Sequence, residues 1–169
     1  ILNHNEKALA DLNKALSLNP SSNIALLNRG AVKRALGRYD ESLADLQKAI
    51  VLQPDLAEAH NNLGNTLREL GKFQEAEKSY IKALALKPEY AEAHNNLGNT
   101  LRELGKFQEA QTRCAQAIVL KPEYAEAHCN LGVTLRELGK FREAQTRFTQ
   151  AIVLKPEYAE AHRTLANMK

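Results

Sequence analysis

Residues 57–76 read AEAHNNLGNTLRELGKFQEA, and residues 91–110 repeat these letters without a change, 34 positions later. Two glycine ladders and one alanine ladder keep the same step, beginning at Gly30, Gly37 and Ala15. The five prolines also stand 34 residues apart, at Pro20, Pro54, Pro88, Pro122 and Pro156. A fixed period of about 20–50 residues is typical of proteins built from stacked copies of one structural unit. The sequence therefore predicts four full repeats, at residues 23–56, 57–90, 91–124 and 125–158.

Each repeat is predicted to form two α-helices. In repeat 57–90 the first helix is expected from about residue 57 to 70, because Leu63, Leu67 and Leu70 recur on one helical face. Gly71 is expected to end it in a left-handed backbone conformation, which costs glycine little. The second helix is expected from about residue 74 to 86, before Pro88, because proline cannot continue a helix. Small or apolar side chains are expected where the two helices touch: Gly64, Ala76, Tyr80, Ala83 and Leu84.

This pattern resembles the tetratricopeptide repeat (TPR) family, whose unit is a 34-residue helix–turn–helix. Counting from the start of each repeat, the family has a large residue at position 4, Leu-Gly at 7–8, Ala at 20, an aromatic at 24, Ala at 27 and Pro at 32. Repeat 57–90 supplies them as His60, Leu63, Gly64, Ala76, Tyr80, Ala83 and Pro88. Departures from the family are mild: His replaces Trp at position 4, Leu replaces the aromatic at position 11, and Cys114 occupies position 24. The resemblance implies an all-α fold, a TPR α-solenoid in which the repeats stack into a right-handed superhelix.

The same alignment assigns residues 1–169 to a single array. Residues 1–22 match the second half of a repeat, and residues 159–169 match the first half. Because a repeat in such an array contacts only its neighbours, each end is expected to expose an unpaired helix. Two outcomes stay open. Residues 159–169 of one molecule pack against residues 6–18 of the next in head-to-tail self-association, or the chain is a monomer with two exposed ends.

Composition argues against several functional classes. The 23 basic and 20 acidic side chains are interspersed, aromatic residues make up only 5%, and Trp is absent. Nucleic-acid binders usually concentrate basic residues in one stripe, so we expect no nucleic-acid partner. No apolar stretch approaches the roughly 18 residues that a membrane-spanning helix needs, so no membrane insertion is expected. Two isolated cysteines, Cys114 and Cys129, are expected to be reduced, which favours the cytoplasm or another reducing compartment.

The resemblance also implies a binding surface. In TPR proteins the first helices line a concave face through positions 2, 5, 6, 9, 12 and 13. Amides dominate these positions here, and an amide can bond both the N–H and the C=O of a bound peptide; arginines add carboxylate contacts. The candidate peptide-binding residues are Asn28, Asn61, Asn62, Asn65, Asn95, Asn96, Asn99, Asn130, Arg68, Arg102 and Arg136. The asparagine row resembles the ladder in the repeat region of the O-linked N-acetylglucosamine (O-GlcNAc) transferase. Alternatively, the amides are solvated or bridge neighbouring helices.

No catalytic pattern emerges from the sequence. The four histidines at position 4, His60, His94, His128 and His162, form a row. Equivalent helices lie about 10 Å apart, too far for a shared metal, so the row is expected to pack. Cys129 at position 5 is a candidate reactive thiol, although no histidine base stands beside it in sequence.

We therefore expect no enzyme activity, no cofactor and no metal. The expected function is a non-catalytic scaffold that binds a peptide or partner protein. The alternatives are the substrate-presenting region of a larger enzyme, such as a glycosyltransferase, and a self-assembly module.

Overall fold

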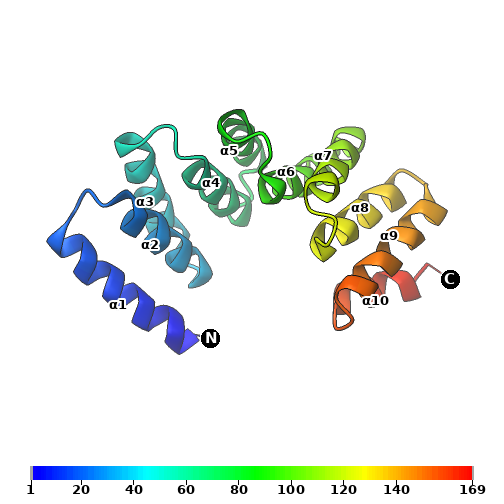
Figure 1. Ribbon diagram of the computed structural model, residues 1–169, viewed down its shortest axis with the longest axis horizontal. Helices are drawn as coiled ribbons and strands as arrows, with labels where there is room; N and C mark the ends of the chain where they lie inside the picture. The colour runs from blue at the N-terminus through cyan, green and yellow to red at the C-terminus, as the bar shows by residue number, and fades with distance from the viewer. Residues whose placement is uncertain (1, 169) are drawn as a thin grey trace. The chain divides into compact units, whose positions relative to one another are not determined.

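The computed structural model describes residues 2–168, and their side chains from residue 4 onward. This part of the chain folds into ten α-helices joined by short turns, with no strand among the described residues (Figure 1). The helices are α1 (Leu2–Leu18), α2 (Asn23–Ala35), α3 (Tyr39–Leu52), α4 (Ala57–Glu69), α5 (Phe73–Leu86), α6 (Ala91–Glu103), α7 (Phe107–Leu120), α8 (Ala125–Glu137), α9 (Phe141–Leu154) and α10 (Ala159–Ala166). The all-α helical-repeat solenoid predicted from the 34-residue period is confirmed.

The helices fall into two compact units. The N-terminal unit, Ile1–Pro88, contains α1 to α5, and the C-terminal unit, Glu89–Lys169, contains α6 to α10. Within each unit every helix packs against the next one in the chain. The first helices of successive repeats, α2 with α4 and α6 with α8, also pack together. This second contact is what stacks one helix pair on another, and it places the first helices side by side.

The predicted helix ends are confirmed to within one residue in repeat 57–90. Gly71 has φ +72°, the left-handed conformation expected of it. The Gly71 N–H donates to the Arg68 carbonyl at 2.9 Å, and the Lys72 N–H donates to the Leu67 carbonyl at 2.9 Å. These two bonds form a Schellman motif, which satisfies carbonyls that a helix end leaves unpaired. At the other end of α5, the Lys87 N–H bonds the Ala83 carbonyl at 2.9 Å, and the helix stops before proline.

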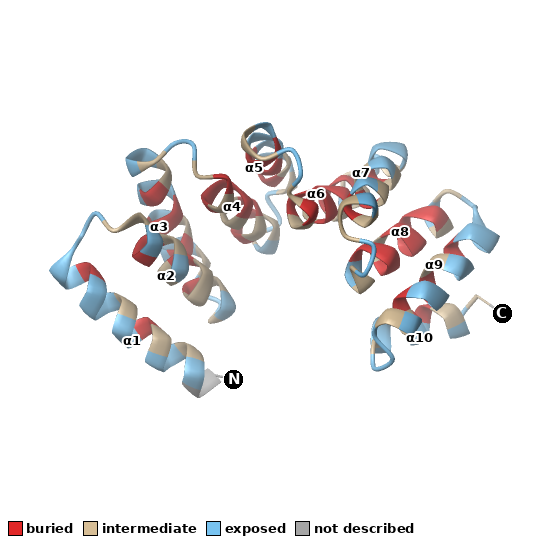
Figure 2. Ribbon diagram, viewed as in Figure 1, coloured by how far each residue is buried: buried red, intermediate tan, exposed pale blue. Residues whose placement is uncertain are grey.

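The small residue at position 8 lets the two helices of a repeat touch. A Cβ added to Gly64 would lie 2.6 Å from the Tyr80 ring, and one added to Gly132 would lie 2.8 Å from the Phe148 ring. The position-24 side chains packed over these glycines are fully buried, and so is Cys114 over Gly98. A thiol therefore fills the aromatic position of repeat 91–124 without exposing it. Figure 2 shows the buried residues gathered along the facing sides of these helices.

Candidate functional site

The predicted polar face lies on the first helices. We define it as the Asn, Glu and Arg side chains at positions 2, 5, 6, 9 and 12 of α2 and α4 in the N-terminal unit and of α6 and α8 in the C-terminal unit. Its members differ in exposure. Asn28 is exposed, Asn61 and Asn95 are buried at 4% exposure, and the remaining asparagines and the arginines at position 12 are partly exposed. The partly exposed residues are Asn62, Asn65, Asn96, Asn99, Asn130, Arg34, Arg68, Arg102 and Arg136.

A hydrogen-bond relay in the C-terminal unit orients one of these amides. The buried Asn95 donates from Nδ2 to the Tyr124 hydroxyl at 3.4 Å. Its Oδ1 accepts from Nδ2 of Asn130, on the next first helix, at 2.9 Å. Burial, followed by the charges of Glu126 and Glu92, raises the pKa of Tyr124 to about 12, so the phenol stays neutral at physiological pH. Asn95 therefore holds Asn130 with its amide nitrogen turned inward and its carbonyl oxygen free to accept.

The amide at position 9 depends on the residue at position 24 of the same repeat. In repeat 57–90 the Tyr80 hydroxyl donates to Asn65 Oδ1 at 2.8 Å. Cys114 has no hydroxyl, and in repeat 91–124 Asn99 Oδ1 instead accepts from Arg102 at 2.7 Å. These bonds favour the view that part of the asparagine row serves the packing of neighbouring side chains.

Charge on the polar face is largely balanced within the three later repeats. The arginines at position 12 pair with the glutamates that follow them, at 3.5 Å for Arg68, 2.6 Å for Arg102 and 3.1 Å for Arg136. The glutamates at position 2 pair with lysines at position 31, and both the Glu58–Lys87 and the Glu92–Lys121 pairs measure 3.3 Å. A ligand on this surface would therefore be bound mainly by hydrogen bonds from the amides and not by net charge.

Both cysteines are free, buried thiols. Burial raises the pKa of Cys114 to about 12 and that of Cys129 to about 11. Cys129 also shares a hydrogen bond with Tyr158. Because the thiolate is the nucleophile, these pKa values leave both side chains inert at physiological pH. The reactive role considered for Cys129 is therefore wrong, because the Cys129 side chain is fully buried.

Three of the four histidines at position 4, His60, His94 and His128, are buried as predicted, whereas His162 of α10 is exposed. Ring Nε2 atoms lie within hydrogen-bond distance of the proline carbonyl six residues earlier: 2.9 Å for His60, 2.9 Å for His128 and 2.7 Å for His162. Each contact ties the start of a first helix to the turn before it. Burial lowers the pKa of His128, whose neutral ring suits this site. The described residues hold no group of three or more His, Cys, Asp or Glu side chains arranged to bind a metal.

Sequence reasoning missed a buried ion network in the N-terminal unit. Asp45 of α3 accepts two bonds from Arg29, at 2.6 and 2.8 Å, and pairs with Lys33 at 2.9 Å. Arg29 also donates to Asn13 of α1 at 2.9 Å. Burial alone raises the pKa of Asp45, but the hydrogen bonds and charges of Arg29 and Lys33 outweigh it, so the pKa is lowered. The available signal was that Arg29 and Lys33 occupy positions 7 and 11, which are leucine in the three later repeats.

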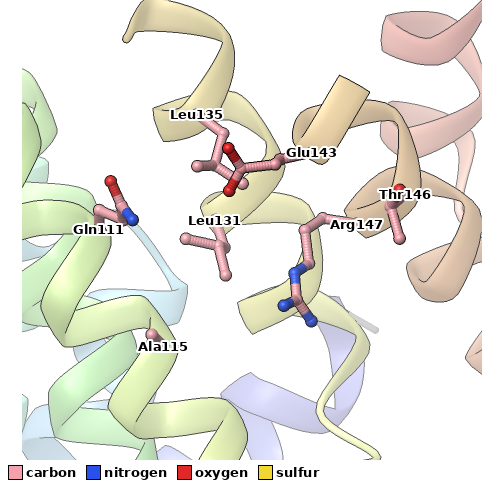
Figure 3. A pocket seen from close by; sticks show the side chains of 7 residues that line it. All are labelled: Gln111, Ala115, Leu131, Leu135, Glu143, Thr146 and Arg147. Carbon is pink, nitrogen blue, oxygen red and sulfur yellow. The ribbon is translucent and has the colours of Figure 1, made fainter. Parts of the chain in front are cut away.

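Sequence reasoning also missed a pocket in the C-terminal unit. It lies between α7, α8 and α9 and has a volume of about 200 Å³ (Figure 3). Its lining residues come from two different repeats, and none of them is an unusual residue type for its position. The cavity forms only when the three helices pack together, so no pattern in the sequence predicted it.

Comparison with known proteins supports the repeat assignment. The tetratricopeptide repeat family model matches residues 21–89, 55–118 and 89–157, which together cover most of the chain. No curated protein matches this chain in sequence. Every helix in the described part of the chain is too short or too polar to span a membrane.

Solved structures share the fold. TTC0263, a thermophilic TPR protein of Thermus thermophilus, has a TM-score of 0.84 at 21% identity, over 99% of this chain and 91% of that one. YrrB, described as a TPR protein with an unusual peptide-binding site, has a TM-score of 0.75 at 27% identity, over 96% and 84%. The first TPR of Spaghetti (RPAP3), bound to an HSP90 peptide, has a TM-score of 0.65 at 27% identity, over 66% and 89%. The chain belongs to the tetratricopeptide repeat family.

Proposed function

We propose that this chain is a protein-interaction scaffold that binds extended peptide segments along the polar face of the first helices within its units. The observation that carries the proposal is the Asn95–Asn130 relay. A buried amide fixes an accessible one, and a side chain ordered in advance loses less conformational freedom when a ligand binds. Peptide binding by the similar proteins YrrB and Spaghetti supports the same class of partner.

Three asparagines at position 6 are the proposed contacts: Asn62, Asn96 and Asn130. Each is partly exposed on a first helix. One amide can meet both the N–H and the C=O of a peptide bond, so recognition would rest on the ligand's backbone more than on its side chains. Asn61 and Asn95 are buried, and we assign them to holding the exposed amides in place. Asn28, Asn65 and Asn99, with Arg68, Arg102 and Arg136, are proposed as secondary contacts.

The test is a random-peptide selection against the chain, followed by binding measurements on the selected peptides. Changing the three position-6 asparagines to Ala is expected to weaken binding by about tenfold to thousandfold, since each of the three lost hydrogen bonds contributes about 0.5–1.5 kcal/mol net. Gln116→Ala and Gln150→Ala remove exposed amides from second helices and serve as matched controls. Unchanged peptide affinity in the triple variant would show that the polar face does not bind these peptides.

A larger enzyme that uses this array to present substrates is the second candidate. The asparagine row, with its resemblance to the repeat region of O-GlcNAc transferase, motivates it. The gene that encodes this chain decides the matter, since a catalytic domain in the same reading frame is required. A reading frame without such a domain would reject the idea.

Head-to-tail self-association and the arrangement of residues 1–169 as one array stay predictions. Sedimentation equilibrium at several protein concentrations tests the first, because a concentration-independent monomer mass contradicts it. Proteolysis tests the second, because a single array resists cleavage near Pro88 and Glu89. We also propose a reducing compartment, which the two free, buried thiols suit.

A further inference from the structure

The pocket between α7, α8 and α9 has an apolar floor and the size of one side chain. Leu131 and Leu135 of α8 form the floor, and Gln111 and Ala115 of α7 form one wall (Figure 3). Its volume is about 200 Å³. That exceeds the roughly 150 Å³ of an apolar cavity that holds a benzene ring, and falls below the roughly 300 Å³ at which small-molecule sites begin. The dimensions suit a single Leu, Met or Phe side chain rather than a cofactor.

Two opposite charges stand on the α9 wall. Glu143 and Arg147 are one helical turn apart, a spacing at which such residues usually pair. In Figure 3 they point to different ends of the pocket, the carboxylate toward Leu135 and the guanidinium past Leu131. No ion pair joins them to each other or to another described side chain. The pocket therefore offers an apolar centre with an unpaired negative charge at one end and an unpaired positive charge at the other.

We propose that this pocket is a docking site for a segment of a partner protein in which one large apolar side chain lies between a basic and an acidic residue. The apolar side chain fills the space over Leu131 and Leu135. The basic residue meets Glu143, and the acidic residue meets Arg147. The site goes beyond the proposed function, because it uses positions 7, 11, 19 and 23 of repeat 125–158 and none of the polar face.

The corresponding positions of repeat 23–56 show why this site is not general to the chain. There the leucines of the floor are replaced by Arg29 and Lys33, and the position of Arg147 is taken by Asp45. Asp45 forms ion pairs with both Arg29 and Lys33. These charges neutralise one another and leave no apolar floor, so repeat 23–56 offers no such docking site.

The test uses fluorescein-labelled peptides with a central leucine flanked by Lys on one side and Glu on the other, in both orders. Binding is followed by fluorescence anisotropy. One order is expected to bind, and replacing its leucine with Ala is expected to weaken binding at least tenfold, because Ala leaves most of the apolar space over Leu131 and Leu135 unfilled. Ala115→Leu fills the pocket from its wall and is expected to weaken binding at least tenfold. Ala115→Ser is the matched control and leaves the space open.

A charge exchange makes the test independent of stability. In the double variant Glu143→Arg with Arg147→Glu, the preferred order of Lys and Glu in the peptide is expected to reverse. Urea midpoints and circular dichroism spectra of all variants confirm that the fold is retained. No binding up to roughly millimolar peptide, equal binding of the Leu and Ala peptides, or an order preference that survives the exchange would each overturn the proposal. Peptides whose binding depends on Asn96 and Asn130 but is unchanged by Ala115→Leu would overturn the pocket proposal and support the proposed function.

Discussion

The Asp45 network provides the sharpest test of how this fold is held together. Asp45→Asn keeps the shape of the side chain and removes the charge that Arg29 and Lys33 share. Only 7% of the Asp45 side chain is exposed, against 21% for Arg29 and 10% for Lys33. Breaking a buried pair by removing one partner typically costs about 3–5 kcal/mol, because a buried charge is left uncompensated. The partial exposure of Arg29 and the nearby Glu41, 3.5 Å from Lys33, place the expected loss near the lower bound, about 3 kcal/mol.

The chain contains its own control for this experiment. Repeat 57–90 carries Leu63, Leu67 and Ser79 at the positions of Arg29, Lys33 and Asp45. The triple variant Arg29→Leu, Lys33→Leu and Asp45→Ser transplants that arrangement. Replacing a whole buried ion network with apolar residues is often neutral or stabilising by about 1–4 kcal/mol. The single variant is therefore expected to be destabilised, and the triple variant to be at least as stable as the natural chain.

Urea unfolding followed by circular dichroism measures both variants, and hydrogen exchange of α2 and α3 amides localises the effect. The pH dependence supplies a second readout. Because the pKa of Asp45 is lower in the folded chain, its contribution is fully present above the unfolded value of about 4. It is lost as the pH falls from there through the folded pKa, and the triple variant lacks this loss. A single variant within about 0.5 kcal/mol of the natural chain, or a triple variant equally destabilised, would refute the reasoning.

Three further predictions concern packing and thiol chemistry. Gly64→Ala is expected to destabilise the chain by about 1–3 kcal/mol in urea titrations, since the new Cβ would overlap the Tyr80 ring; an unchanged midpoint contradicts this. At pH 8, iodoacetamide is expected to label Cys129 and Cys114 many-fold more slowly in the native chain than in urea, since burial raises both pKa values to about 11 and 12; equal rates would show exposed thiols. Asn95→Ala is expected to weaken the binding of peptides selected on the polar face by about tenfold, although Asn95 itself does not contact the peptide. Unchanged peptide affinity in this variant would show that the relay has no role in binding.

The period, the helix pairs and the helix ends could all be predicted from the sequence. Each depends on local chemistry. Gly71 adopts a left-handed backbone wherever a helix must stop, and proline ends the next helix whatever surrounds it. The contact between positions 8 and 24 was also predictable, because the small residue recurs at the same spacing in every repeat.

Which polar residues are accessible was decided only in three dimensions. Asn95 and Asn96 are neighbours in sequence with identical chemistry, yet one is buried and the other is partly exposed, because α8 packs over one side of α6. The buried ion network and the pocket share this origin, since each collects side chains from three helices. The sequence of a repeat determines how that repeat folds, but contacts between repeats depend on pairs of residues far apart in the chain.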